Sequence, residues 1–312
     1  MKRFSSLIFK LATGVVVLWL LGQFVSDRWL WSQWLFWIPT FAILVFLLCT
    51  TIVLVFLKDK RNSIVLGFVF ILFVGWFLFV ENRVFSTTTK HGDLRILGWT
   101  MSHSKSRLTA DSAALIVELN ADISLLTHGW KVRGEPVIKE WQGKKGKRLV
   151  NGPFTLFTTL RPLEVRTLVA SNGIYISLYK LDTTEQIGHE LVIFAVDLPA
   201  DWRLSRREIV RRAKKLLRQA DAPEPDLVIG DFNMTKNSNS LHRFFPNMKD
   251  GWDKAGAGWS YTYHRAFPLF QIDHMLLNKD LHPAMYELID PQIGRHNIQL
   301  LELDSEDLVN DI

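Results

Sequence analysis

The 312 residues carry a formal net charge of +6, but the positive excess is unevenly distributed along the chain. Residues 1–83 contain eight Lys and Arg against three Asp and Glu, whereas the other 229 residues contain 29 against 28. A near-neutral C-terminal part argues against a basic groove, so a nucleic-acid partner is not expected. The single cysteine, Cys49, excludes a disulfide framework or a thiolate metal site within the chain.

Three apolar stretches come first, at about 6–25, 35–57 and 63–80. Each approaches the ~20 residues that a helix needs to cross the hydrocarbon core of a bilayer. We therefore predict three transmembrane helices that form an anchor over residues 1–83, with the lipid bilayer as a partner. Four tryptophans typical of a membrane interface lie just before and at the start of the second stretch: Trp29, Trp31, Trp34 and Trp37.

Positive charges predict the orientation of this anchor. Lys2 and Arg3 precede the first stretch, Lys10 lies near its N-terminal end, and the short basic segment 58–62 joins the second to the third. Cytoplasmic loops of membrane proteins are enriched in Lys and Arg, so these ends are placed in the cytoplasm. The rest of the chain is then expected on the periplasmic or extracellular side of a bacterial inner or plasma membrane.

After a linker at 84–92, short β runs and helices alternate over residues 93–304, and an acidic tail follows at 305–312. Helices are expected at 109–120, at 203–220 and near 238–245. Strands are expected at 94–100, 121–127, 154–160, 164–170, 173–180, 190–197, 226–233, 261–266, 271–278 and 298–304. This pattern predicts an α+β domain, a four-layer sandwich of two packed, mainly antiparallel sheets flanked by helices.

The segment "DLVIGDFN" (226–233) is a buried strand that ends in a carboxylate and an amide, Asp231 and Asn233. Both residue types favour turns, so a loop-capping pair is the structural alternative to a functional site. About forty residues later comes "IDH" (272–274), with "GWSYTY" (258–263) between them, and "GRHN" (294–297) follows. This order of motifs resembles the endonuclease/exonuclease/phosphatase superfamily, and within it a bacterial subgroup with three preceding membrane spans.

The resemblance covers about residues 93–304 and implies metal-dependent phosphoester hydrolysis. It also implies roles for the residues that match the family pattern. Asp231 and Asn233 are expected to position the attacking water and the phosphate. His296 is expected to act as the base and Asp273 to orient it.

The metal side of the family site matches less well. The family holds magnesium with an Asn, a Glu and an Asp, where this sequence has Thr100, His128 and Arg295. Asp197 stands in place of a family His, and Asp231 is the remaining candidate metal ligand. Magnesium or manganese is the implied cofactor, but an imidazole and a guanidinium in place of carboxylates weaken the binding of a hard cation.

Two alternatives remain open for the substituted positions. Arg295 could occupy the place of the cation by pairing with Asp231 or Asp197, or grip a phosphate. A softer metal could instead be held by His128, Asp231 and Asp197. Arg295, Asp197 and His128 are therefore the candidate substrate-binding residues.

The function expected from these residues is a membrane-anchored phosphoester hydrolase acting on a phosphorylated small molecule or a phospholipid-derived substrate. The alternative is a catalytically inactive, membrane-tethered protein that binds phosphate or lipid, or acts as a scaffold. The basic runs at 203–218 and 144–148 are typical of solvated faces, and their alternative role is contact with anionic phospholipid headgroups.

Overall fold

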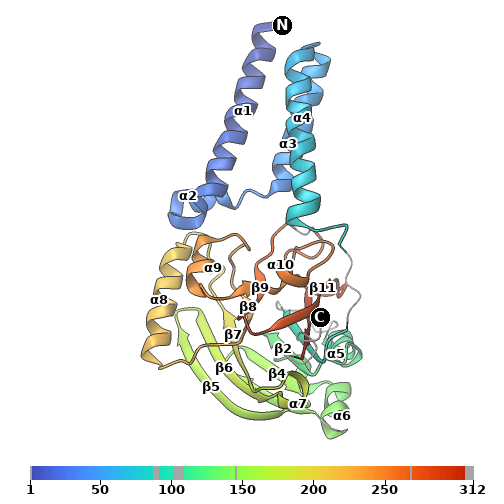
Figure 1. The fold of residues 1–312 in the computed structure, drawn as a ribbon, viewed down its shortest axis with the longest axis vertical. Coiled ribbons are helices and arrows are strands. Elements are labelled where there is room, and N and C mark those ends of the chain that lie inside the picture. The colour runs from blue at the N-terminus through green and yellow to red at the C-terminus, as the bar shows by residue number, and fades with distance from the viewer. Residues whose placement is uncertain (1, 87–90, 102–108, 145, 268, 306–312) are drawn as a thin grey trace.

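Three long helices stand on one end of a two-sheet domain (Figure 1). The computed structural model describes residues 2–86, 91–101, 109–144, 146–267 and 269–305. The long helices are α1 (Lys2–Val25), α3 (Thr40–Phe56) and α4 (Lys60–Trp76), and α4 continues as a π-helical turn over Phe77–Glu81. They pack through a small apolar cluster that includes Val16, Leu47 and Leu66.

The expected second membrane span is bent. α2 (Leu30–Phe36) and α3 meet at an angle of 62°. Pro39 at the start of α3 has no backbone N–H and disfavours helical geometry in the residue before it, so one helix cannot run through this point. Within the described residues, two helical segments are long and apolar enough to cross a membrane, 2–28 and 60–81, and a third is counted if the bent pair forms one span.

Two six-stranded mixed sheets form the rest of the chain. The first has the strand order β11-β12-β1-β2-β4-β3, and the second has the order β5-β6-β7-β8-β10-β9. The first sheet contains β1 (Leu94–Thr100), β2 (Ile123–Thr127), β3 (Lys147–Asn151), β4 (Phe154–Thr158), β11 (His282–Ile289) and β12 (Ile298–Asp304). The second contains β5 (Arg161–Ser171), β6 (Ile174–Asp182), β7 (Leu191–Asp197), β8 (Leu227–Asp231), β9 (Lys249–Asp250) and β10 (Asp273–Leu277).

Helices cover the outer face of each sheet, which confirms the predicted four layers. α5 (Thr109–Glu118) and α6 (Pro136–Lys144) share an apolar cluster with the first sheet. α8 (Arg206–Gln219) and α9 (Asn239–Phe244) share one with the second. The main core, which includes Ile96, Ile193 and Met275, lies between the sheets. Shorter helical segments are η1 (Ser26–Arg28), η4 (Val132–Gly134), α7 (Thr184–Ile187) and α10 (Gly251–Ala255).

Some elements differ from the sequence-based expectation. β3, β11 and α6 were not predicted, and β3 places part of the basic run 144–148 on a sheet edge, where Lys commonly protects unpaired strands. The expected strand at 261–266 forms only isolated bridges, from Tyr263 to Phe270 and to His296. Residues 87–90 of the expected linker and 306–312 of the expected tail lie outside the described residues.

Two parallel pairs at the centre of the sheets set the position of the polar residues. β1 runs parallel to β2, and β7 runs parallel to β8, so each pair ends at the same edge. The backbones at this point are close, because a Cβ at Gly230 would lie 1.8 Å from the Val196 carbonyl oxygen. Only glycine fits there, which explains why Gly230 begins the motif "GDFN".

The first turns of α8 and α9, which follow β7 and β8, contact the helical part. Asp27 Oδ1 accepts a hydrogen bond from Ser240 N at 3.1 Å, and Gln33 Oε1 accepts one from Arg206 N at 3.0 Å. Both Asp27 and Gln33 are buried. The edge where β7 and β8 end is therefore tied to the helices that could span a membrane.

Candidate functional site

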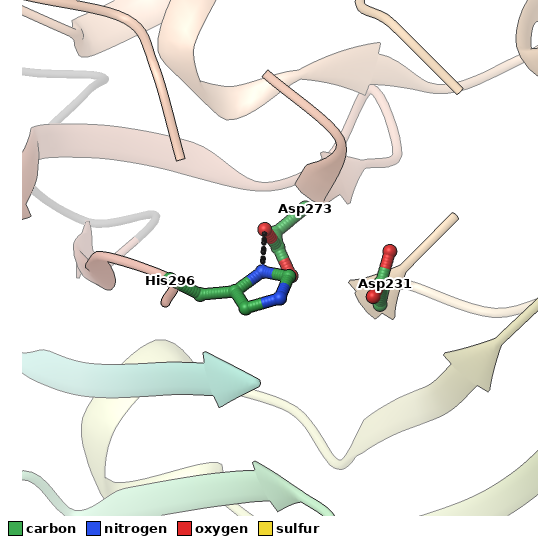
Figure 2. A group of neighbouring side chains, drawn as sticks. All are labelled: Asp231, Asp273 and His296. Atoms are coloured by element: carbon green, nitrogen blue, oxygen red, sulfur yellow. Dashed lines mark hydrogen bonds and ion pairs between the residues drawn. The ribbon is translucent and has the colours of Figure 1, made fainter. Parts of the chain in front are cut away.

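A buried aspartate–histidine pair forms the centre of the candidate active site. β10 begins at Asp273, directly opposite Asp231 in the β8–β10 register, and His296 comes two residues before β12. His296 Nδ1 donates a hydrogen bond to Asp273 Oδ2 at 2.8 Å (Figure 2). The sequence-based prediction that these two residues meet is confirmed by this contact, and their roles in catalysis remain a prediction.

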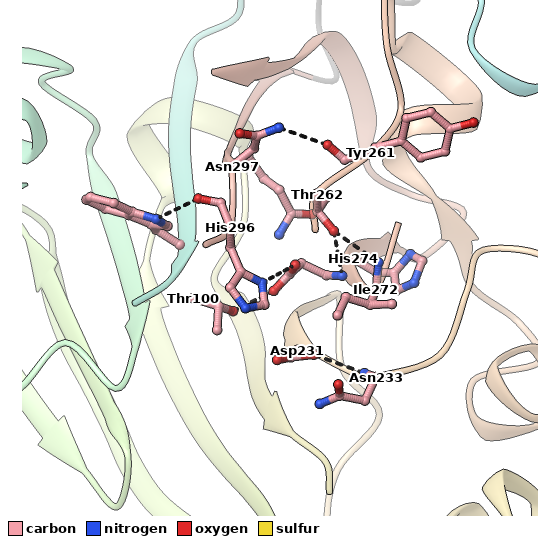
Figure 3. Close-up of polar contacts among 12 residues, drawn as sticks. Thr100, Asp231, Asn233, Tyr261, Thr262, Ile272, His274, His296 and Asn297 are labelled. Atoms are coloured by element: carbon pink, nitrogen blue, oxygen red, sulfur yellow. Dashed lines mark hydrogen bonds and ion pairs between the residues drawn. The ribbon is translucent and has the colours of Figure 1, made fainter. Parts of the chain in front are cut away.

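Asp273 is fixed on its other side as well. Thr100 Oγ1 donates to Asp273 Oδ1 at 2.5 Å, and Asp273 N donates to Thr262 Oγ1 at 3.1 Å (Figure 3). Burial opposes ionisation of this carboxyl, but the His296 charge and these hydrogen bonds outweigh it and lower the pKa of Asp273. Asp273 is thus held as an oriented carboxylate. Thr100 therefore serves as a hydrogen-bond donor to the site.

Asp231 and Asn233 share one turn at the end of β8. Asn233 N donates to Asp231 Oδ1 at 3.0 Å, and Asn233 Nδ2 donates to the Leu198 carbonyl oxygen at 2.9 Å. Asn233 has a φ of +50°, a left-handed conformation that asparagine tolerates better than most residues. The pair therefore does cap a loop, as the structural alternative proposed. The Asp231 side chain also faces His296 (Figure 2).

Burial and the neighbouring charges shift the pKa values of this cluster in opposite directions. Burial, together with the negative charges of Asp273 and Asp197, raises the pKa of Asp231 well above its ordinary value, although His296 acts in the other direction. Burial lowers the pKa of His296, but Asp273 and Asp231 outweigh it, so that the net shift of the His296 pKa is upward. Figure 2 shows the second ring nitrogen of His296 on the side of Asp231. The protonation of Asp231 and that of His296 are therefore linked.

His128 and Asp197 form a second pair beside the first. His128 Nε2 lies 3.1 Å from Asp197 Oδ2, and Asp197 is the register partner of Asp231. Asp197 raises the pKa of the half-buried His128 through this hydrogen bond, against the effect of burial. The end of β2 thus carries an imidazole that pairs with a carboxylate at the end of β7. The two residues meet because His128 comes directly after β2 and Asp197 is the last residue of β7.

Arg295 does not enter the cluster. Its side chain is exposed, and it forms no ion pair with any residue in the described ranges. The hypothesis that it pairs with Asp231 or Asp197 is wrong, because Arg295 lies on an exposed turn before His296. Its effect on the site is through its charge, which opposes the upward shift of the His296 pKa.

A second arginine, Arg206, interacts electrostatically with Asp231. It was assigned from the sequence to a solvated face, but only 2% of it is exposed. One guanidinium nitrogen donates to the Pro199 carbonyl oxygen at 2.5 Å, and the group lies 5.1 Å from the ring centre of Trp37. Burial lowers the pKa of Arg206 to about 10, although Asp231 and other carboxylates act against this. Its position at the first turn of α8 gives no sequence signal for burial.

One group of described residues has the geometry of a metal site. Single donor atoms of Asp231, Asp273 and His296 all lie within 4.8 Å of one another, and all three residues are buried. Two carboxylates and an imidazole suit manganese or zinc better than magnesium, which prefers oxygen donors. The donor set therefore fits a divalent cation.

Comparison with known proteins finds one family match and several similar solved structures. The model of the Endonuclease/Exonuclease/phosphatase family matches residues 145–295. A mannosyl-6-phosphatase from Bacteroides thetaiotaomicron is similar with a TM-score of 0.52 at 13% identity, over 67% of this chain and 99% of that one. A functionally unknown protein from Enterococcus faecalis has a TM-score of 0.54 at 12% identity, over 68% and 100%. An AP endonuclease from Archaeoglobus fulgidus has a TM-score of 0.52 at 12% identity, over 68% and 99%.

These structural similarities show the fold, and the family match agrees with them. The two-sheet domain has the endonuclease/exonuclease/phosphatase fold, and enzymes of that family typically depend on a divalent metal. A comparison with curated proteins finds no match.

Proposed function

We propose that this chain is a membrane-anchored phosphoester hydrolase whose catalytic domain lies on the periplasmic or extracellular side of a bacterial membrane. The observation that carries the proposal is the His296–Asp273 pair beside Asp231, with donor atoms within 4.8 Å of one another. The superfamily fold supports phosphoester chemistry, and no Arg295–Asp231 ion pair among the described residues neutralises the Asp231 carboxylate.

The proposed chemistry assigns each residue a separate task. Asp273 is a positioning residue that holds His296 Nδ1–H, so that Nε2 can accept a proton from a water as it attacks phosphorus. Asp231 orients this water or hydrogen-bonds a phosphoryl oxygen, and the turn at Asn233 fixes the Asp231 carboxyl. His128 and Asp197 form the neighbouring wall of the site, within reach of a bound phosphate.

A divalent cation, for which the mixed donor set favours manganese over magnesium, would be held by Asp231 and Asp273. When bound, it would neutralise charge on the phosphoryl oxygens. The raised pKa of Asp231 supports this assignment, because its carboxyl lies in a buried site with an excess of negative charge.

Exposed aromatic residues support the membrane anchor. Trp202 of the domain lies 4.6 Å, ring to ring, from Trp34 of α2, and Phe267 lies 6.3 Å from Phe41 of α3. More than half of the Trp202 and Phe267 side chains is exposed. Aromatic residues of this kind favour the membrane–water interface, so this face of the domain is expected to lie against the headgroups.

Hydrolysis by the purified full-length protein tests the proposal. The substrates are p-nitrophenyl phosphate and bis-p-nitrophenyl phosphate, each with magnesium, manganese or a chelator. We expect metal-stimulated turnover that falls by at least ~10²-fold in the separate variants His296→Ala and Asp231→Ala. His242→Ala, which removes an exposed histidine of α9, is the matched control and should retain full activity.

The second candidate is an inactive phosphate-binding protein, which the substitutions Thr100, His128 and Arg295 favour. Under this alternative, inorganic phosphate would bind in a calorimetric titration, and neither substrate would turn over with any metal. That outcome would replace the hydrolase proposal.

A further inference from the structure

A cavity of about 830 Å³ lies between the helical part and the domain, separate from the Asp231–Asp273–His296 cluster. This volume falls within the ~300–1,000 Å³ typical of small-molecule sites. Its upper wall is apolar and is formed by α1 and α4, with Leu20, Phe24 and Trp76 among the lining residues. These side chains are also among the exposed apolar residues of segments long enough to span a membrane. In Figure 1, α1 and α4 lie farther apart at their domain ends than at their opposite ends.

The floor of the cavity is polar and belongs mainly to the domain. Lys236 and Asp253 form an ion pair there, with 15% of the Lys236 side chain exposed. The Glu81 carboxylate lines the same cavity and accepts hydrogen bonds from Thr40 Oγ1 at 2.6 Å and from the Tyr261 hydroxyl at 3.0 Å. One ammonium group and two carboxylates therefore face the space beneath the apolar wall.

An unpartnered acceptor lies in the same floor. Gln271 is 5% exposed, and its Nε2 donates to Asp250 Oδ2 at 3.3 Å. Its Oε1 is buried without a hydrogen-bond partner among the described residues. A buried acceptor without a partner is costly, so a turn of the Gln271 amide that brings Oε1 to the cavity surface, where a ligand can donate to it, would be favoured.

We infer that this cavity binds a phospholipid with a zwitterionic, primary-ammonium headgroup, of the phosphatidylethanolamine type. The headgroup phosphate pairs with Lys236, and the ammonium group contacts the carboxylates and donates to Gln271 Oε1. The glycerol and the first part of the acyl chains lie against α1 and α4, and the remainder of the chains lies in the bilayer. The inference rests on the membrane anchoring of the proposed function and is independent of catalysis.

The charges and donors of the floor select this class of lipid. A purely anionic headgroup would meet two carboxylates and one ammonium group, which disfavours it. A trimethylammonium headgroup has no N–H and would leave Gln271 Oε1 without a donor. A free phosphate or phosphoethanolamine would leave the apolar wall uncovered.

Photo-crosslinking in lipid nanodiscs tests this inference. The full-length protein is placed in phosphatidylcholine nanodiscs that contain a phosphatidylethanolamine with a diazirine in one acyl chain. We expect labelling concentrated in peptides 19–24 and 72–76. Unlabelled phosphatidylethanolamine should compete, and phosphatidylcholine, phosphatidylglycerol and soluble phosphoethanolamine should compete much less. Equal competition by phosphatidylcholine or phosphatidylglycerol, or uniform labelling along α1 and α4, would overturn the site.

Variants locate the headgroup. Lys236→Met and Gln271→Met should each weaken the specific labelling by about five- to tenfold. The matched control exchanges the exposed pair on α6, Lys144→Glu with Glu140→Lys, and should label as the unmodified chain does. If a variant misfolds, the competition series on the unmodified chain decides alone. Extraction of cell membranes with alkaline carbonate is run in parallel, so that a failure of anchoring is distinguished from the absence of a lipid site.

Discussion

At the end of β2, the His128 imidazole lies beside the candidate metal site, and a carboxylate can be put in its place. His128 pairs with Asp197 near Asp231, so a carboxylate at position 128 would face the same space. We expect His128→Glu to bind manganese at least about tenfold more tightly than the unmodified chain, as added ligands commonly do. The measurement is the metal-dependent rise in melting temperature, which follows binding to the folded state. His128→Gln is the control, and an equal metal response in both variants would contradict the expectation.

His274, next to Asp273, is a residue that the sequence did not single out. Its Nδ1 lies 2.6 Å from Asp250 Oδ2 and its Nε2 lies 2.8 Å from the Met234 carbonyl oxygen. Both partners are acceptors, so the geometry favours the doubly protonated ring. Burial lowers the pKa of His274, but the Asp250 carboxylate outweighs it, and the net shift of this pKa is upward.

This upward shift gives stability that depends on pH. A folded-state pKa above the unfolded value means that the stabilisation is fully present below the ordinary histidine pKa of ~6.5 and is lost as the pH rises through the folded value. We expect His274→Gln to lose about 1.5–3 kcal/mol of unfolding free energy at low pH and less as the pH rises. Thermal melting between acidic and mildly alkaline pH measures this. A difference from His242→Gln that does not change with pH would contradict it.

The contact between helices and domain depends on the start of α9. Ser26 Oγ accepts from Asn239 N at 3.0 Å, and Asp27 Oδ1 accepts from Ser240 N at 3.1 Å, so a segment from the helical part caps a helix of the domain. We expect Asp27→Ala to speed hydrogen exchange of the amides at 239–241 by about five- to tenfold, which corresponds to the loss of a cap of about 1 kcal/mol. Asp59→Ala, which removes the cap of α4, is the control. Unchanged exchange at 239–241 would show that this contact does not hold α9.

Elements that bury an unbroken apolar run could be predicted from the sequence. β1 was expected at 94–100 and forms there, because every second and most intervening side chains are buried between layers. β3 and β11 are half-exposed, and their apolar pattern is weak, so that pairing with β4 and β12 determines them instead. The bend before α3 was encoded by Pro39, but the surrounding apolar residues read as one continuous span.

At the scale of the whole molecule, the sequence predicted which residues meet more reliably than what surrounds them. The Asp273–His296 contact followed from the order of motifs along the chain. The donor Thr100 and the buried Arg206 could not be predicted, because their partners come from strands and loops far away in the sequence. The same limit applies to the cavity under α1 and α4, since its wall and floor come from opposite ends of the chain.

The orientation of the molecule in a membrane remains a prediction, and the arrangement of its charges makes it testable. The N-terminus and the turn between α3 and α4 lie at the end of the helices opposite the domain (Figure 1). Lys2 and Arg3 lie at the first point, and Lys58, Lys60 and Arg61 lie at the second. With the basic end in the cytoplasm, the domain is on the other side of the membrane. We expect a C-terminal alkaline phosphatase fusion to be active in bacterial cells and a C-terminal green fluorescent protein fusion to be dark.

Neutralising the turn tests the cause of this orientation. Replacing Lys58, Lys60 and Arg61 by Gln removes positive charge from the predicted cytoplasmic side, so the active fraction of the phosphatase fusion should fall. The matched control replaces Lys144, Lys147 and Arg148 by Gln, because these three charges lie in the domain, away from the membrane helices. A fluorescent fusion of the unmodified chain would place the domain in the cytoplasm. Equal phosphatase activity in both triple variants would mean that contacts between helices and domain, such as those of Asp27 and Gln33, set the orientation instead of charge.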